Sequence, residues 1–311
     1  MAIASGRSGS FWIRISLTVV VTAVVALMLP SLALSVRVIV GSNAACPSSK
    51  VISTLWNTFR QAEIAEQLTK ASRLLSRDPE GYELWETPRG RFWIPQRSMA
   101  SYYLFQMLAE EDRQVYGCGD YGVRPGDIAL DCGANVGAYT RDALNRGARL
   151  VVAIEPAPDN LECLKRNFRE EIEDGRVIVY GKGVWDRDAE LELSSNEWSS
   201  GGYRFLQPGT PRGKGPVLAL TTIDKLVEEL RLERVHLIKM DIEGAEKKAL
   251  AGAVNTLVTQ RPKLVIATEH AADDTEKIPA LIQTLSAGYQ VECGACALFN
   301  GLVRREAMYF R

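Results

Sequence analysis

Short apolar runs and longer amphipathic segments alternate along the C-terminal two thirds of the chain. Helical patterns such as LECLKRNF (161–168) and AEKKALAGAVNTLV (245–258) separate the runs. This alternation predicts an α/β fold with a doubly wound, mostly parallel sheet and helices on both faces. The later runs YQVEC (289–293) and AMYFR (307–311) are expected to add two strands, one of them antiparallel. The other predicted strands are IALDC (128–132), LVVAIE (150–155), VIVYG (177–181), HLIKMD (236–241) and KLVIATE (263–269).

The chain before this sheet has a different pattern, which predicts a cap of accessory elements. Apolar residues recur at helical spacing over 51–75, which indicates one or two helices. The segment YELWETPRGRFWIP (82–95) predicts a hairpin around Pro-Arg-Gly, and 98–117 has the pattern of an amphipathic helix. Further along, 194–215 is rich in Ser, Gly and Pro and predicts a long functional loop.

An uncharged hydrophobic stretch covers 15–36. A hydrocarbon core needs about 20 apolar residues, so we expect a single-pass membrane anchor here. The positive residues Arg7 and Arg14 before it, and the small residues Ala33 and Ser35 near its end, leave a cleaved signal peptide as the alternative. The predicted organisation is an anchor or signal segment (1–40), a linker with accessory helices and a hairpin (41–115), and one α/β domain (116–311).

The charge and the cysteine content of the chain limit the kinds of partner and metal site that we expect. Lys and Arg number 37 and Asp and Glu number 38, so the formal net charge of -1 gives no basic footprint for nucleic acid. Cys132 lies in the ligand loop described next, and we expect the catalytic part to be reduced. Cys293 and Cys296 have CxxC spacing, but no second pair accompanies them, so they are interpreted as strand cysteines and no metal site is expected.

The segment IALDCGANVG (128–137) has the pattern of a ligand cradle, because a buried strand ends in an acid and turns through glycines into a helix. Gly133 and Gly137 let the backbone approach a ligand closely. Asp131 is placed to reach the cationic amino group of a bound amino acid. Glu155 ends the next strand, where a carboxylate accepts hydrogen bonds from ribose hydroxyls. A dinucleotide site shares this geometry, but it has the motif G-x-G-x-x-G. Asn135 stands where the middle glycine of that motif would be.

A second group of polar residues follows later strands of the predicted sheet. Asp241 and Glu243 come after HLIKM, and His270 directly follows KLVIATE. Ligands of open α/β sheets bind at the carboxyl ends of the strands, so these side chains are expected in the same cleft. Asp241 and Glu243 are candidates to hold an acceptor or take its proton, with His270 as a possible base near neutral pH, while Glu246 fits a helix-capping role.

The sequence blocks resemble those of FkbM-type methyltransferases, in the same order, from about Tyr116 to His270. The resemblance implies a Rossmann-like class I methyltransferase fold with a seven-stranded sheet, and 116–311 as the catalytic domain. It also implies S-adenosyl-L-methionine as cofactor, and it supports Asp131, Gly133, Asn135, Gly137 and Glu155 as its binding set. The blocks are DRQVYGCGDYGVRPGDIALDCGANVGAYT, VVAIEPAPDNLECLKRNF, LTTIDKL, LIKMDIEGAEKKALAGA and RPKLVIATEH.

The predicted activity is therefore methyl transfer to a hydroxyl of a sugar, glycolipid or secondary metabolite, with a small molecule or glycan as acceptor. Asp241, Glu243 and His270 are the predicted catalytic residues, and no metal is required. Because the cofactor is made in the cytosol, the catalytic domain is expected on the cytosolic side of the membrane. Two alternatives stay open: a dinucleotide-dependent oxidoreductase, and a membrane-tethered binding module without activity.

Overall fold

The computed structural model describes most of the chain after the leader. The described residues are Val25, 51–97, 99–194, 204–205, 215–294, 296–299 and 302–311. Among them, no helix is both long and apolar enough to cross a membrane. The predicted membrane segment, 15–36, lies outside the described residues apart from Val25. Whether it is an anchor or a signal peptide therefore stays a prediction.

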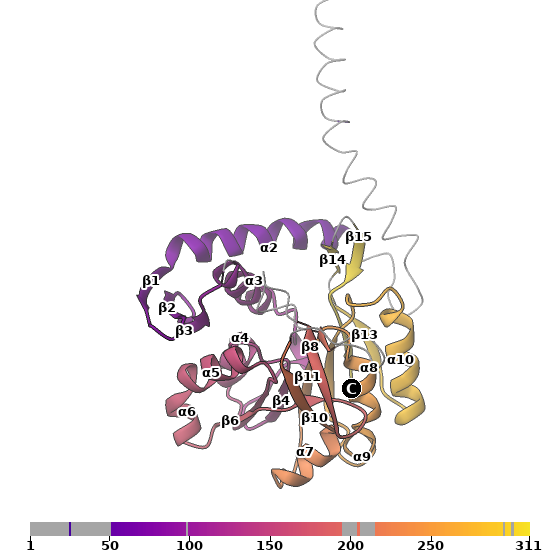
Figure 1. The fold of residues 1–311 in the computed structure, drawn as a ribbon. Helices are drawn as coiled ribbons and strands as arrows, with labels where there is room; N and C mark the ends of the chain where they lie inside the picture. The colour runs from indigo at the N-terminus through magenta and orange to yellow at the C-terminus, as the bar shows by residue number, and fades with distance from the viewer. Residues whose placement is uncertain are drawn as a thin grey trace, which may run out of the picture.

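A seven-stranded sheet forms the centre of the fold (Figure 1). Its strands lie in the order β13-β16-β12-β11-β4-β5-β6, with parallel neighbours from β12 to β6. β16 runs in the direction opposite to the other strands of this sheet and pairs antiparallel with both β12 and β13. The predicted mostly parallel sheet is thus confirmed. The bounds are β4 Ile128–Cys132, β5 Leu150–Ile154, β6 Val177–Tyr180, β11 Leu237–Met240, β12 Lys263–Ala267, β13 Val291–Cys293 and β16 Ala307–Phe310.

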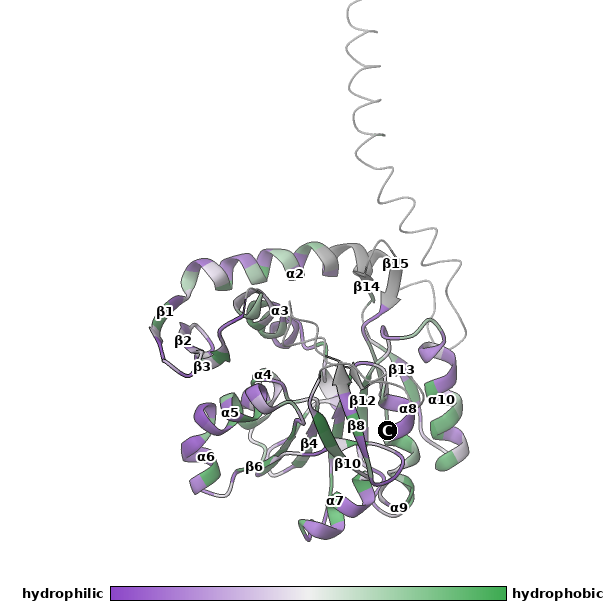
Figure 2. Cartoon of the chain, viewed as in Figure 1, coloured by the Kyte–Doolittle hydropathy of each residue, from purple (hydrophilic) through white to green (hydrophobic). Residues whose placement is uncertain are grey.

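Both faces of this sheet are apolar and covered by helices. In β4, Leu130 and Cys132 pack toward one face and Ala129 toward the other, because successive strand residues point to opposite sides. The surrounding helices carry both hydrophilic and hydrophobic residues, as expected for elements that bury one side (Figure 2). One face holds α7 (Ile223–Glu229), α8 (Glu246–Ala251), α9 (Val254–Thr259) and α10 (Asp274–Leu285), and the other holds α4 (Ala138–Asn145), α5 (Pro158–Asn167) and α6 (Arg169–Glu173).

The helical pattern predicted for 245–258 is confirmed, and the chain forms two short helices there, α8 and α9. Gly252 lies at the break between them. A Cβ atom at this position would overlap the carbonyl oxygen of Trp185. The close approach of two backbone segments therefore ends α8, and helical periodicity alone gives no sign of it.

The N-terminal elements form the cap that the sequence predicts. They are α2 (Val51–Ala71), β1 (Arg73–Arg77), β2 (Tyr82–Thr87), β3 (Gly90–Pro95) and α3 (Ala100–Asp112). The predicted hairpin is β2–β3, and the predicted amphipathic helix is α3. The helical pattern expected up to residue 75 ends earlier, because 73–77 pairs with β2 as a third strand. In Figure 1, α2 lies across the top of the described fold, with α3 beneath it.

The cap shares a hydrophobic core with the sheet domain. Phe92 and Leu104 are fully buried and belong to one cluster with Val136, which lies in the glycine turn, and Cys163 of α5. Asn167 reinforces this contact, since its side-chain amide donates to the carbonyl of Val136 and accepts from the backbone of β3. The cap is therefore packed directly against the predicted ligand loop.

Two smaller sheets complete the described fold. One has the order β7-β10-β8-β9, and the other is the β14–β15 hairpin. The long loop predicted over 194–215 is described only at Ser194, 204–205 and 215, and there it includes the end of β8 and all of β9; its other residues lie outside the described part. The bounds are β7 Gly183–Val184, β8 Ala189–Ser194, β9 Arg204–Phe205, β10 Val217–Thr221, β14 Cys296–Phe299 and β15 Leu302–Arg305.

The cysteines correct one expectation. Cys293, in β13, is disulfide-bonded, so the prediction of a fully reduced catalytic part is wrong at this residue. Cys132 and Cys296, among others in the described chain, are free and buried. Cys293 and Cys296 therefore do not pair with each other, and both lie in strands as predicted.

Candidate functional site

The glycine turn after β4 depends on two close contacts. Gly133 and Gly137 both adopt left-handed backbone conformations, with φ of 81° and 96°. A Cβ on Gly133 would overlap the carbonyl oxygen of Asp241, and one on Gly137 would overlap the ring of Phe168. Asn135 also lies in the left-handed region, at φ 52°. The turn thus requires its glycines, and it touches the backbone that begins the second polar cluster.

Asp131 is fully buried beneath this turn. Its Oδ2 accepts a hydrogen bond from the hydroxyl of Thr140 at 2.7 Å, and its Oδ1 lies 3.1 Å from Nζ of Lys239. Lys239, in β11, also donates to the carbonyl of Gly133 at 2.9 Å. Both partners of this ion pair are removed from water, so each requires the other for its charge to be tolerated. The structure therefore gives Asp131 a protein cation as its partner, and its predicted contact with a ligand's amino group stays untested.

Lys239 is further enclosed by aromatic rings. Its Nζ lies 5.2 Å from the ring centre of Tyr116 and 5.8 Å from that of Tyr139, within the range of cation–π attraction. Burial by itself disfavours its charged form, but Asp131 and Asp241 outweigh it and raise the pKa of Lys239 above its usual range. Lys239 is thus charged at neutral pH and ties β11, β4 and the turn together.

Glu155 connects the turn to the loop after β5. One of its carboxylate oxygens accepts from the backbone N–H of Asn135 at 3.0 Å, and the other accepts from Ala157 at 2.8 Å. Burial raises the pKa of Glu155 to about 7, although these hydrogen bonds act in the opposite direction. The side chain of Asn160 also hydrogen-bonds to this carboxylate, and because a carboxylate offers about four lone pairs, it can still accept from a ligand hydroxyl. Glu155 is therefore positioned as the sequence predicts, beside the glycine turn.

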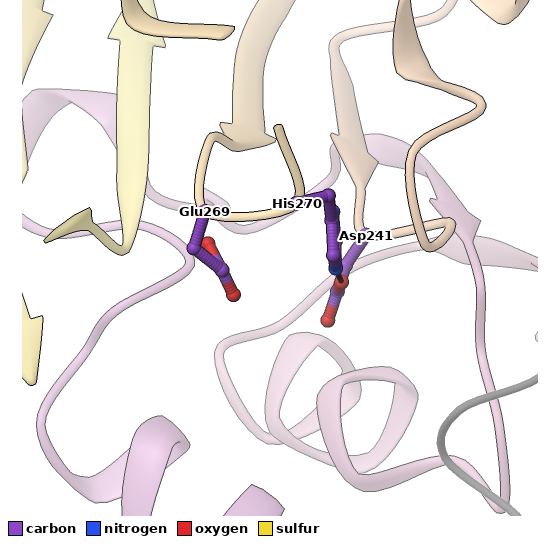
Figure 3. A group of neighbouring side chains, drawn as sticks. All are labelled: Asp241, Glu269 and His270. Atoms are coloured by element: carbon purple, nitrogen blue, oxygen red, sulfur yellow. Dashed lines mark ion pairs between the residues drawn. The ribbon is translucent and has the colours of Figure 1, made fainter. Parts of the chain in front are cut away.

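The second cluster gathers around His270, at the carboxyl ends of β11 and β12 (Figure 3). Its Nδ1 lies 3.1 Å from Glu246, and its Nε2 lies 3.5 Å from Asp241 and 3.7 Å from Glu243. The structure thus brings together the three residues predicted as catalytic. Their exposure separates their roles, because the side chains of Asp241 and Glu243 are 29% and 24% exposed, whereas that of Glu246 is 1% exposed.

Glu246 lies in the first turn of α8, as the sequence predicts, and it binds the loop that precedes this helix. One of its oxygens accepts from the backbone N–H of Ile242 at 3.0 Å and of Gly244 at 3.4 Å, at the start of α8. Burial alone would favour the neutral acid, but His270 and these hydrogen bonds lower the pKa of Glu246. Glu246 is therefore an anion that orients His270 from below.

The electrostatics of His270 favour its protonated form. Burial disfavours the imidazolium, but Glu246, Asp241 and Glu269 together outweigh burial and raise the pKa of His270 to about 10. At neutral pH both ring nitrogens then carry hydrogens, and the ring has no lone pair with which to take a proton. Asp241 and Glu243 are left as the predicted proton acceptors.

Several residues of this site escape the sequence analysis. Tyr116 donates from its hydroxyl to Asp241 at 2.9 Å, and Glu269 lies beside His270 on the same loop (Figure 3). Glu110, from α3 of the cap, faces the same acids: burial, with Asp241 and Glu306 nearby, raises its pKa to about 8. Lys239 could have been found from the sequence, because it is a charged residue inside an otherwise apolar strand. The others come from distant segments, so no spacing in the sequence connects them.

A doubly wound sheet with a glycine turn and an acid at the carboxyl ends of adjacent strands defines a Rossmann-like protein. Residues 131–291 match the family model described as the methyltransferase FkbM domain. This match covers more than half of the chain, and the chain belongs to that family.

Three curated methyltransferases are similar to the chain over about half of its length. Hexuronic acid methyltransferase AglP of Haloferax volcanii is 26% identical over 159 residues, which are 50% of this chain and 61% of AglP. The 31-O-demethyl-FK506 methyltransferase FkbM of Streptomyces tacrolimicus is 27% identical, over 49% of this chain and 68% of that protein. The 2-O-methyltransferase NoeI of Sinorhizobium fredii is 30% identical, over 44% and 62%. The chain thus spans about three fifths to two thirds of these relatives.

We predict that Lys239→Met destabilises the fold by about 3–5 kcal/mol, because it leaves Asp131 as an uncompensated buried charge. The double variant K239M/D131N is expected to lose less than the single variant, since it removes both charges. Urea unfolding followed by circular dichroism measures the effect. Lys225→Met is the matched control, because Lys225 is exposed in its pair with Asp188 and is expected to change stability by less than about 1 kcal/mol. Equal losses in K239M and K225M would contradict the assigned role.

Proposed function

We propose that this FkbM-family chain transfers a methyl group from S-adenosyl-L-methionine to a hydroxyl oxygen of a sugar, glycolipid or secondary metabolite. The observation that carries this proposal is the contact between the glycine turn and Asp241, which leaves no room for a Cβ on Gly133. A nucleoside held at the turn would therefore lie next to the exposed acids of the second cluster. The printed names of AglP and NoeI, which describe a hexuronic acid methyltransferase and a 2-O-methyltransferase, support an oxygen acceptor.

The residues around the turn fit this cofactor. Glu155 presents carboxylate oxygens for ribose hydroxyls, and the left-handed glycines open the backbone for close approach. Asp131 is fully buried against Lys239, so we propose that it supports the cofactor by fixing the turn. The dinucleotide alternative is less favoured, because Asn135 occupies the position of the middle glycine and its backbone N–H already binds Glu155.

The bound cofactor supplies an electrophilic methyl group on a sulfonium. The protein then has to orient the acceptor, exclude water and remove one proton from the acceptor hydroxyl. Asp241 and Glu243 are the partly exposed acids beside His270, and Tyr116 fixes Asp241 through its hydroxyl. We propose that one of these two carboxylates takes the proton as the oxygen–carbon bond forms and the carbon–sulfur bond breaks. The products are a methyl ether, S-adenosylhomocysteine and the proton.

For localisation, we propose that the leader 15–36 attaches the chain to a membrane or directs its export. The disulfide at Cys293 favours the side of the membrane away from the cytosol, because disulfides persist in oxidising compartments. The origin of the cofactor suggests the opposite, a catalytic domain in the cytosol. We give the disulfide at Cys293 more weight than the origin of the cofactor.

We predict that the purified chain binds S-adenosylhomocysteine and not NAD, as measured by calorimetry. Asp241→Asn should keep this binding within about twofold, because Asp241 faces the acceptor, yet lose at least about 100-fold of the methylation rate, in the range of a removed general base. Mass spectrometry of sugar or glycolipid acceptors for one added methyl group gives the rate. Binding of NAD alone would support the oxidoreductase, and full activity of D241N would remove the proposed role.

We predict that affinity for S-adenosylhomocysteine rises by roughly tenfold from about pH 6 to about pH 8. The carboxylate of Glu155 accepts ribose hydrogen bonds only when ionised, and burial raises its pKa to about 7. The bound ligand should favour the ionised form and release a proton. Glu155→Gln, which cannot titrate, should bind weakly and without this pH dependence. A flat profile in the wild type would contradict the contact between Glu155 and the ribose.

We predict that alkaline phosphatase, which needs disulfides, is active when fused to the C-terminus of the full chain in its native host. A fluorescent protein that matures only in the cytosol should be dark in the same position. The opposite pattern would place the catalytic domain in the cytosol.

A further inference from the structure

Three side chains converge in a way that suits a shared ligand. One oxygen of Asp241, one oxygen of Glu269 and one ring nitrogen of His270 all lie within 4.8 Å of one another. The loop after β12 supplies Glu269 and His270, and the segment after β11 supplies Asp241 (Figure 3). Nε2 of His270 is 3.5 Å from Asp241, beyond the usual length of about 2.7–3.2 Å for an N–H···O hydrogen bond. Atoms that each lie about 2.0–2.3 Å from one cation are separated by roughly 3–4.5 Å.

A second observation concerns the other side of the imidazole ring. Nδ1 of His270 lies 3.1 Å from an oxygen of Glu246 in an ion-pair contact that does not have hydrogen-bond geometry. The side chains of His270 and Glu246 are 8% and 1% exposed. Histidines that bind metals generally direct their second nitrogen to a carboxylate, which fixes the ring and its tautomer. The pair therefore has the form of a metal-binding histidine with its supporting acid, and it leaves Nε2 directed at Asp241.

Charge and access agree with a cation at this point. The two carboxylates supply negative charge that a divalent cation balances, and His270 supplies a ring nitrogen once the cation replaces its proton. Asp241 is 29% exposed, so the position is open to an exchanging ion and to an acceptor. Glu243, whose oxygen is 3.7 Å from the same Nε2, adds a further acid at the rim. A mixed nitrogen and oxygen donor set suits first-row divalent metals better than magnesium or calcium, which prefer oxygen alone.

We propose that Asp241, Glu269 and His270 bind one first-row divalent metal cation, with His270 as a ligand through Nε2. The cation takes the place of the proton on that nitrogen. Its remaining coordination positions are open to oxygens of the acceptor, which favours acceptors with two adjacent oxygens, such as a vicinal diol or a hydroxy acid. The cation site adds to the proposed function. Only the part that concerns the acceptor rests on that function. In the transfer, the acceptor hydroxyl loses its proton to Glu243, the oxygen–carbon bond forms, and the carbon–sulfur bond to the cofactor breaks.

The test uses Mn²⁺ as the probe on the detergent-solubilised full chain after treatment with a chelator. Calorimetry is expected to show one Mn²⁺ per chain, and pulsed electron paramagnetic resonance is expected to show coupling of the manganese to a nitrogen. Glu269→Gln and His270→Gln should each weaken Mn²⁺ binding by at least about tenfold, and H270Q should abolish the nitrogen coupling. Asp273→Asn is the matched control, because Asp273 pairs with Lys247 and Lys277 away from the cluster and should bind Mn²⁺ like the wild type.

Thermal unfolding of each variant identifies any that fail to fold, and the nitrogen coupling in the wild type tests the ligand without a variant. Absence of Mn²⁺ binding in the wild type, binding without nitrogen coupling, or unchanged affinity in both E269Q and H270Q would overturn the cation site. Calorimetry with S-adenosylhomocysteine in the presence of chelator tests the proposed function separately. Binding of S-adenosylhomocysteine without binding of Mn²⁺ would overturn the cation site and support the methyltransferase. Binding of Mn²⁺ without binding of S-adenosylhomocysteine would support the cation site and overturn the methyltransferase.

Discussion

The buried ion pair between Lys239 and Asp131 is the interaction on which the site geometry depends. Lys239 comes from β11 and Asp131 from β4, and the same ammonium donates to the carbonyl of Gly133 in the turn. Neither charge is tolerable in the interior without the other, so the pair fixes how the two strands meet at their carboxyl ends. The glycine turn is held from below by this pair and from the side by the backbone of Asp241. The predicted cofactor and acceptor regions are therefore parts of one rigid edge.

Electrostatics at this edge separate residues that look equivalent in the sequence. Asp241, Glu243 and Glu246 lie within six positions of one another, yet only the first two retain access to solvent. Glu246 is enclosed, binds the loop before α8 and, with its neighbours, raises the pKa of His270. Burial thus separates the enclosed Glu246 from Asp241 and Glu243, the two acids that we propose to act on the acceptor. The proposed metal site has the same cause, the close approach of several acids to His270. A bound cation would balance their negative charge in place of the proton on His270.

The cap takes part in the site. Its helix α3 brings Glu110 toward Asp241, and Arg113 of the segment just after α3 pairs with Glu306 in a contact that is almost completely buried. The glycine turn contributes Val136 to the same hydrophobic cluster as Phe92 and Leu104. Changes in the cap are therefore transmitted to the turn through packing. The hydroxyl of Tyr116, between the cap and β4, extends this link to Asp241.

The sequence by itself determined the fold class, the order of the main strands and the local placement of the turn. These features follow from short-range patterns: the apolar runs, the glycines at 133 and 137, and the acids that end strands at 131 and 155. The tertiary structure alone decided what each charge faces. It joined Lys239 to Asp131, ended α8 at Gly252, gave Cys293 a disulfide and surrounded His270 with acids that raise its pKa. Such outcomes depend on burial and on partners far along the chain, which no local spacing encodes.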